Sequence, residues 1–353
     1  MAYSGWHGDV VSDSVAVLGA ALLAGNGVVF RAPAAAPETA RLIAELAVEA
    51  GVPDGLVQVV DSDADLGGMG GVDAFFYRGP RAGAVELTAA AGARDVPVPV
   101  YTDVLGGNSV YVDGSADLED AATLVCTAAF LDCGRHRAAV DRVFVDARVY
   151  APFLNMLATE VRNLRAGPAF DIDAHVGPAV GLAGGSAIDD VVRVVKDAVD
   201  GGAVVAAGGQ PGKFGSGIYT PTLLADCTER MEIMGGGQSG YGNGDVVVGP
   251  VVGVMPVPRS RGDEDLVRLV NQQRHVRSFA WFEGGQGDGD GEADGSEAEA
   301  ARAAERPFDA FARSHASLAL HNRVGVVSPN LPDGFFGTDG LRAFLRRKAV
   351  VVE

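Results

Sequence analysis

The sequence predicts an α/β protein with two parallel-sheet domains and helices on both faces of each sheet. Short apolar strands alternate with amphipathic helices along most of its 353 residues. Parallel strands need crossover connections, and this alternation supplies them. The length is enough for two domains. Apolar residues make up 48% of the chain and charged residues 21%, proportions typical of a globular protein.

The individual elements follow from spacing and punctuation. Residues 13–31 predict a helix that leads into a buried strand, because leucines recur at helical spacing before a Gly-Asn pair and a Val-Val-Phe run. Residues 37–51 predict an amphipathic helix with a proline at its start and a glycine after its end. Further strands are expected at 57–60, 73–77, 97–101, 110–112, 203–206 and 349–352, and further helices at 117–131, 148–164 and 187–201.

Two segments interrupt this pattern. Residues 235–245 form a glycine-rich insert, GGGQSGYGNGD. Residues 284–305 are acidic, rich in glycine and low in complexity. Because such a composition buries little apolar surface, we expect 284–305 to be a disordered loop.

The charge balance excludes one class of partner. The chain carries 46 acidic and 28 basic residues, a net charge of −18, and a surface this negative repels phosphate backbones. We therefore expect no nucleic-acid partner. Lysine is rare among the basic residues. The composition is halophile-like, since dense salt screens self-repulsion, and a genome that favours arginine codons is the alternative.

Other classes are excluded by segments that the chain lacks. Its apolar runs are shorter than the roughly 18 residues of a membrane span. The N-terminus has no basic stretch ahead of its apolar residues, so we expect no signal peptide, no membrane partner and a cytoplasmic location. Cys126, Cys133 and Cys227 are too few and too scattered for a disulfide framework, and no Cys/His spacing suggests a metal site.

Eight segments, in order, resemble the aldehyde dehydrogenase superfamily. The first four are ALLAGNGVVFRAP (21–33), TARLIAELAVEAGVPDGLVQVV (39–60), PVYTDVLGGNSVYVDGSADLEDAA (99–122) and AFLDCGRHRAAVDRVFV (129–145). The others are LRAGPAFDIDAHVGPAV (164–180), IYTPTLLADCTERMEIM (218–234), VVVGPVVGVMPV (246–257) and GLRAFLRRKAVVVE (340–353). Each is weak alone, but their shared order identifies the chain as an N-terminally shortened, divergent member.

The resemblance implies a domain organisation. Residues 1–133 would form an incomplete NAD(P)-binding-type domain, because family members carry over a hundred residues ahead of the first matching segment. Residues 134–330 would form a catalytic-type α/β domain that contains the disordered loop. Residues 331–353 would return to the first domain or to an oligomerisation arm.

The resemblance also places the residues of the reaction. Family members oxidise aldehydes with a cysteine thiolate, and Arg137 stands at that cysteine's position. A guanidinium stays protonated and cannot attack a carbonyl, although its fork can bind a carboxylate or phosphate. A salt-bridged arginine is the plainer interpretation. Cys133, one turn earlier, is most simply a small buried side chain, and the alternative is that it acts as a substitute nucleophile.

Two further groups of the reaction have changed. Asp103 stands where the family has the glutamate base, so the carboxylate is one methylene shorter. Its alternative role is that of a turn or cap aspartate. Gly8 stands where the family has an oxyanion-holding asparagine, and glycine has no side-chain donor.

The cofactor positions implied by the resemblance are mixed. Arg31 replaces a lysine that contacts the adenosine ribose, and Gly79 retains the glycine of a family turn that reads YRGP here. Val246 stands at the nicotinamide-ribose glutamate, with Asp245 beside it. The resemblance thus implies NAD or NADP as the cofactor, although some of the family's cofactor-binding side chains are replaced in this sequence.

Two functions remain open. The resemblance implies NAD(P)-dependent oxidation of a small-molecule aldehyde to a carboxylic acid, impaired or lost through Arg137. The alternative is a non-catalytic pseudoenzyme that binds a ligand, or that assembles as a homo-oligomer or with a full-length homologue.

Overall fold

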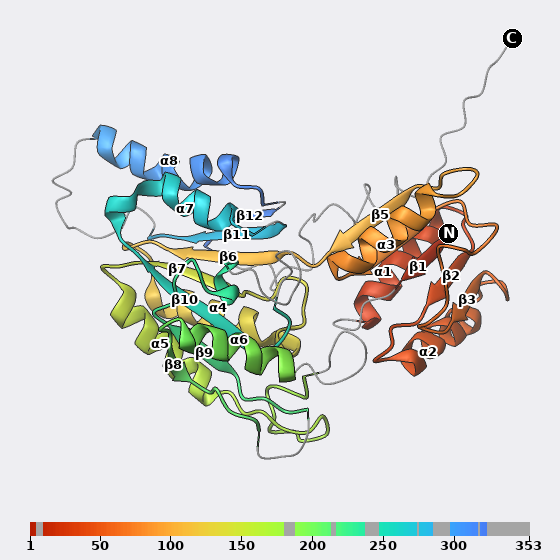
Figure 1. Ribbon diagram of the computed structural model, residues 1–353, viewed down its shortest axis with the longest axis horizontal. Coiled ribbons are helices and arrows are strands. Elements are labelled where there is room, and N and C mark those ends of the chain that lie inside the picture. Colours follow the sequence, from red (N-terminus) through yellow and green to blue (C-terminus); the bar gives the residue numbers. More distant parts are fainter. Residues whose placement is uncertain are drawn as a thin grey trace, which may run out of the picture. The chain divides into compact units, whose positions relative to one another are not determined.

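The computed structural model divides into two compact units (Figure 1). It describes residues 1–4, 10–179, 188–212, 217–236, 247–273, 275–284, 297–316 and 318–322. The described residues of unit 1 lie within Met1–Leu105. Those of unit 2 begin at Gly106. Each unit is a predominantly parallel sheet with helices on both faces, which confirms the predicted fold class.

The sheet of unit 1 has five parallel strands in the order β3-β2-β1-β4-β5. Its strands are β1 (Ala2–Ser4), β2 (Val28–Arg31), β3 (Val57–Val60), β4 (Phe75–Gly79) and β5 (Val100–Val104). The central strand β1 was not predicted from the sequence. Its residue Tyr3 stacks on Phe30 and Phe76, with ring centroids 5.1 and 5.6 Å away, and so joins the two neighbouring strands.

Three helices cover this sheet. Helices α1 (Val10–Leu23) and α2 (Pro37–Glu49) pack on the face that presents Tyr3 and Phe30. Helix α3 (Arg81–Gly92) packs on the opposite face, which presents Phe75 and Tyr77. Because side chains alternate between the two faces of a strand, β4 contributes to both cores. The predicted helix at 37–51 and the predicted helix–strand pair at 13–31 are confirmed.

Unit 2 contains a seven-stranded sheet in the order β12-β11-β6-β7-β10-β9-β8. All neighbouring strands are parallel except β8, an edge strand that runs antiparallel to β9. The strands are β6 (Gly107–Val112), β7 (Arg142–Asp146), β8 (Val204–Ala207), β9 (Thr222–Ala225), β10 (Val251–Val257), β11 (Val276–Phe282) and β12 (Leu318–His321). Such an antiparallel edge on a parallel sheet is common in α/β proteins.

Helices cover both faces of this sheet as well. Helices α4 (Leu118–Phe130) and α5 (Tyr150–Asn163) pack together on one face. The other face forms a core with α6 (Ile188–Asp200), α7 (Gly262–Asn271) and α8 (Glu297–Arg313). Short 3₁₀ turns are η1 (Leu131–Gly134), η2 (Glu232–Met234) and η3 (Arg259–Arg261). Among the helices that the structure describes, none has the length and apolar character to cross a membrane.

Two sequence expectations differ from this architecture. The boundary between the units falls after Leu105, not after residue 133. The reason is long-range pairing, since β6 hydrogen-bonds to β7 and β11 and brings α4 with it. The second difference concerns the loop expected at 284–305, because α8 already begins at Glu297. Its alanines and glutamates are strong helix formers, and Ala310 further along is buried in the core.

Several expectations cannot be compared with the described residues. The remaining part of the expected loop, 285–296, most of the glycine-rich insert and the expected strand at 349–352 lie outside them. The C-terminal segment 331–353 lies outside them too. The incompleteness of the first domain stays a prediction.

Candidate functional site

The loop between α4 and β7 carries Arg137 and is tied to the sheet of unit 2 by one buried amide. The Nδ2 of Asn108, at the start of β6, donates to the carbonyl oxygens of Arg137 at 3.1 Å and Ala139 at 2.9 Å. The Oδ1 of Asn108 accepts a hydrogen bond from Ser278 in β11 at 2.7 Å. Its backbone N–H donates to Asp141 at 2.9 Å. Both ends of the Asn108 amide are therefore satisfied, and the backbone at Arg137 is held in place.

Cys133 lies on the inner side of the same loop. Asp132, Cys133 and Gly134 have positive φ angles of 51°, 59° and 69°, so the chain makes a left-handed turn. The turn directs Cys133 into the protein, where it is only 2% exposed. A side chain at Gly134 would lie 2.0 Å from the carbonyl oxygen of Gly249, so the turn has no room to move in that direction. Cys133 is accordingly a packed side chain.

Burial also removes the reactivity of this thiol. Desolvation raises the pKa of Cys133 to about 12, and the nearby Arg135 lowers it only in part. The Nδ1 of His136 accepts the backbone N–H of Ala138 at 3.2 Å, so this ring nitrogen is already engaged. Since the thiolate is the nucleophilic form, a thiol with this pKa is inert near neutral pH.

Arg137 itself is half-buried in unit 2. Asn108 fixes its backbone, so the loop at the position of the family's cysteine is ordered while the side chain there is a guanidinium. In this loop the backbone of Arg137 is tied to β6, and the Cys133 thiol points inward.

Asp103, the residue at the base position, belongs to unit 1 and is held by Arg78. The Nε and Nη2 of Arg78 both lie on the Asp103 Oδ2, at 2.9 and 2.7 Å. The Nη1 of Arg78 lies 2.6 Å from the Oδ1 of Asp13 in α1. The side chains of Arg78 and Asp13 are 1% and 3% exposed, and that of Asp103 is 14% exposed.

This buried triad limits what Asp103 can do. Burial lowers the pKa of Arg78, but the attraction of Asp13 and then Asp103 outweighs burial and leaves the pKa raised. Arg78 is thus a permanent cation. The positive charge of Arg78 beside Oδ2 favours the ionised form of Asp103, which makes this carboxylate a weaker proton acceptor. Asp103 is better suited to hold Arg78 than to activate a water molecule.

Arg78 and Asp13 were not predicted as site residues from the sequence. The available signal was one cation inside an otherwise apolar strand, FFYRG, in which all five positions are buried. An arginine is rarely buried without a paired carboxylate, so Arg78 in this apolar strand indicated that it has carboxylate partners. Which carboxylates these were depended on the pairing of β4 with β5, and that pairing is long-range.

Arg31 and Gly79, two predicted cofactor residues, lie at one edge of the sheet of unit 1. They are the last residues of β2 and β4, the strands on either side of β1. Ligands of open α/β sheets bind beyond the carboxyl ends of such strands. The Nη1 of Arg31 donates to the carbonyl of Ala64 at 3.3 Å, and burial lowers the pKa of Arg31.

The turn at Gly79 leads into the N-terminus of α3. A side chain at Gly79 would meet the hydroxyl of Tyr77 at 2.8 Å, and that hydroxyl donates to the carbonyl of Pro80 at 2.9 Å. Pro80, the N-cap residue of α3, makes no side-chain hydrogen bond to the helix. It therefore leaves the first backbone N–H groups of α3 without a side-chain acceptor from this position. A cation and a helix N-terminus fit a phosphate-containing cofactor. The other positions, Gly8, Asp245 and Val246, lie outside the described residues.

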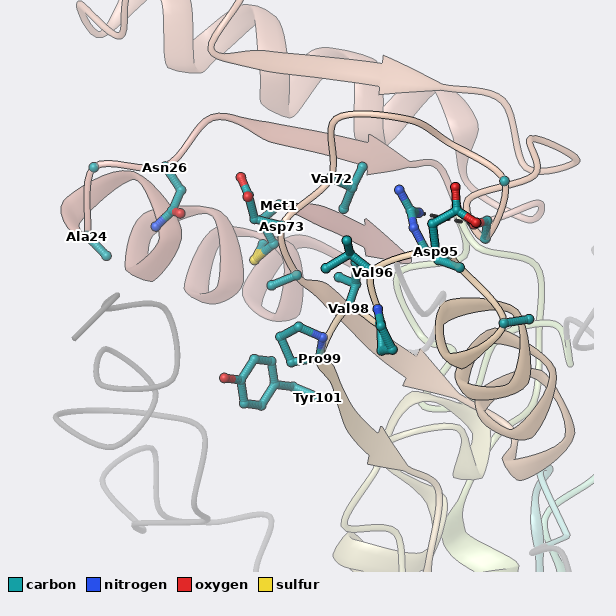
Figure 2. A pocket seen from close by; sticks show the side chains of 17 residues that line it. Met1, Ala24, Asn26, Val72, Asp73, Asp95, Val96, Val98, Pro99 and Tyr101 are labelled. Carbon is teal, nitrogen blue, oxygen red and sulfur yellow. Dashed lines mark hydrogen bonds between the residues drawn. The ribbon is translucent and has the colours of Figure 1, made fainter. Parts of the chain in front are cut away.

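A hollow of about 1120 Å³ occupies the opposite edge of this sheet (Figure 2). Its lining comes from residues that precede the strands, among them Met1, Asn26 and Asp73. The terminal amine of Met1 lies here and donates to the carbonyl of Gly27 at 2.9 Å. Because Arg31 and Gly79 lie at the carboxyl ends of the strands, this hollow does not contain the predicted cofactor residues. Among the described residues, no cluster of three His, Cys, Asp or Glu side chains could hold a metal ion.

A model of the aldehyde dehydrogenase family matches residues 12–277. The chain belongs to this family. Over 223 residues it is 34% identical to proteins named 3-sulfolactaldehyde dehydrogenase from Priestia aryabhattai and Priestia megaterium. These alignments cover 61% of this chain and 44% of each relative, so the chain spans less than half the length of these curated relatives.

Solved structures of aldehyde dehydrogenases share its fold. A lactaldehyde dehydrogenase superposes with a TM-score of 0.81 at 22% identity, covering 99% of this chain and 69% of that one. An NAD-dependent aldehyde dehydrogenase from Sinorhizobium meliloti gives a TM-score of 0.77 at 22% identity, with 94% and 60% covered. At these identities the likeness establishes the fold.

The burial of the three cysteines predicts slow thiol chemistry in the native aldehyde dehydrogenase fold. The pKa values of Cys126, Cys133 and Cys227 are each raised to about 12 by desolvation. At pH 8 we expect Ellman's reagent to modify these thiols slowly in native protein and rapidly after denaturation. A fast-reacting thiol that disappears in Cys133→Ala would contradict this.

The pKa values of the buried thiols also predict how stability depends on pH. Because the folded pKa values exceed the usual 9.0, the free energy of unfolding that these thiols contribute is kept below pH 9 and is lost between about pH 9 and 12.

The buried triad predicts a large stability loss on removal of its cation. In Arg78→Leu, Asp13 and Asp103 stay in the interior without their shared partner. Breaking a buried pair in this way costs about 3–5 kcal/mol, whereas Arg41→Leu, at an exposed pair, should cost at most about 1 kcal/mol. Urea unfolding followed by circular dichroism measures both, and equal losses would show that the triad is unimportant.

Proposed function

We propose that this aldehyde dehydrogenase family member has lost thiol-based aldehyde oxidation as an activity of its own. The supporting observation is that all three cysteines of the chain are buried. The pKa of each is raised to about 12, so about one thiol in 10⁵ is ionised at pH 7. No cysteine in the chain is then a competent nucleophile, whatever the alignment at Arg137.

The proposed loss extends to the second step of the reaction. Release of an acyl group needs a base that activates water. Asp103 is the carboxylate at that position, and Arg78 occupies its Oδ2. Two residues support the proposed loss. In unit 2, Arg137 stands in place of the cysteine, and in unit 1, Asp103 is held by Arg78.

The role that remains is ligand binding through the retained fold. Arg31 and Gly79 at the carboxyl edge of the first sheet support a site for NAD or NADP, which would supply the hydride acceptor in a complete enzyme. Assembly with itself or with a full-length homologue is the second part of the proposal.

The proposed loss predicts a specific pattern of activities. With NAD or NADP and aldehydes that include lactaldehyde and 3-sulfolactaldehyde, wild type and Cys133→Ala should show equal, background NAD(P)H production in high salt. Losing a covalent nucleophile typically costs about 10⁶-fold in rate. Arg137→Cys should gain a thiol that reacts with p-nitrophenyl acetate, while Arg135→Cys serves as the matched loop control. Wild-type turnover that vanishes in Cys133→Ala would refute the proposal.

Cofactor binding is testable without turnover. A ligand at about 100 times its Kd stabilises the native state by about 2.7 kcal/mol, so NAD or NADP should raise the thermal midpoint. In Arg31→Ala this rise should shrink, because the cation at the end of β2 is lost, whereas Arg41→Ala should behave as wild type. Absence of any shift with NAD, NADP or NADPH would exclude the cofactor site and leave assembly as the retained role.

A further inference from the structure

Unit 2 contains a crevice of about 700 Å³ that the predicted reaction does not use. It opens where β9 and β10 end, between the last turns of α6 and η3. The loop with Arg137 lies instead just before the start of β7, which runs parallel to β10. The crevice and this loop are therefore at opposite edges of one sheet. The carboxyl edge is where open α/β sheets bind ligands.

The lining combines an apolar floor with two cations. Met231, Met255 and the buried Cys227 form the apolar part, and Arg230 and Arg261 contribute guanidinium groups. Methionine side chains are flexible and polarisable, so they adapt to apolar bodies of different shape. Guanidinium groups bind carboxylates and phosphates through paired hydrogen bonds.

The carboxylates of the crevice already have donors of their own. The Oδ1 of Asp226 accepts the hydroxyl of Tyr150 at 2.9 Å, and the Oδ2 of Asp197 accepts the backbone N–H of Glu232 at 2.9 Å. A third carboxylate, Glu229, pairs with Arg268 at 2.6 Å. The Glu229–Arg268 pair compensates one negative charge, whereas the neutral donors hold Asp226 and Asp197 in place without removing their charge.

Arg230 differs from these neighbours. It is exposed, and its side chain makes no ion pair or hydrogen bond with another residue of the described part of the chain. This is unexpected in a protein with 46 acidic and 28 basic residues, where carboxylates outnumber cations. Arg261 is held by Asp265 through Nη1 at 3.2 Å. That contact leaves the other donors of its five-donor fork for a ligand.

We propose that this crevice binds a small organic anion with an apolar body. The carboxylate or phosphate group lies on Arg230 and Arg261, and the apolar body lies on Met231 and Met255. The volume is within the range of about 300–1,000 Å³ that is usual for small-molecule sites. This site does not include Cys133 or Asp103. It is also separate from Arg31 and Gly79 at the edge of the sheet of unit 1.

Methionine methyl NMR provides the test, since the chain has only six methionines. Phenyl phosphate, titrated into the full chain labelled at its methionine methyl groups, should shift the Met231 and Met255 resonances in a saturable way. Met1 and Met69 in unit 1 serve as internal controls and should not move. Inorganic phosphate and phenol, which each supply half of the chemistry, should bind at least about tenfold more weakly.

Two variants separate specific binding from adsorption. The double variant Arg230→Ala with Arg261→Ala should weaken phenyl phosphate at least about tenfold, because charge-assisted hydrogen bonds are lost. Arg313→Ala, an arginine of α8 outside the crevice, should leave the affinity unchanged. Unmoved Met231 and Met255 resonances, or equal affinities in the double variant and wild type, would overturn the proposal. Hexanoate in place of phenyl phosphate distinguishes a carboxylate site from a phosphate site.

Discussion

The amide of Asn108 organises the loop that carries Arg137 and Cys133. It joins the start of β6 to the backbone of Arg137 and Ala139, and through Ser278 it also joins β11. A buried amide with both ends satisfied is costly to disrupt, because each orphaned group would cost about 1–3 kcal/mol. The backbone of the loop at Arg137 is therefore held in one path. The same path, with its left-handed turn, directs Cys133 inward.

Fold class, most helices and many strands followed from sequence, because periodicity and glycine or proline punctuation are local signals. β1 was missed because three residues are too few to show a period, and its place is set by Tyr3 between Phe30 and Phe76. The boundary at Leu105 was missed because it depends on the pairing of β6 with strands far along the chain. Composition misled at α8, where acidic residues accompany strong helix formers.

The candidate site shows the same division between local and long-range information. Residue identity alone established that Arg137 cannot be a nucleophile. It left the roles of Cys133 and Asp103 open, because each side chain could be catalytic when exposed and structural when buried. The structure adds the burial of Cys133 and the ion pair of Asp103 with Arg78, and both observations support structural roles. Both depend on contacts that a single sequence does not display, apart from the clue of a lone cation in the apolar strand β4.

These features support one another energetically. Groups that act together in a reaction are strongly non-additive, so once the nucleophile is gone the others contribute little to rate. Under the proposed loss of activity, Asp103 is available for stability, and it shares Arg78 with Asp13 in the interior of unit 1. The contact of Arg78 with the Asp103 Oδ2 stabilises the triad, and the same positive charge makes Asp103 a weaker base. The position of Asp103 thus fits a chain in which packing has taken precedence over proton transfer.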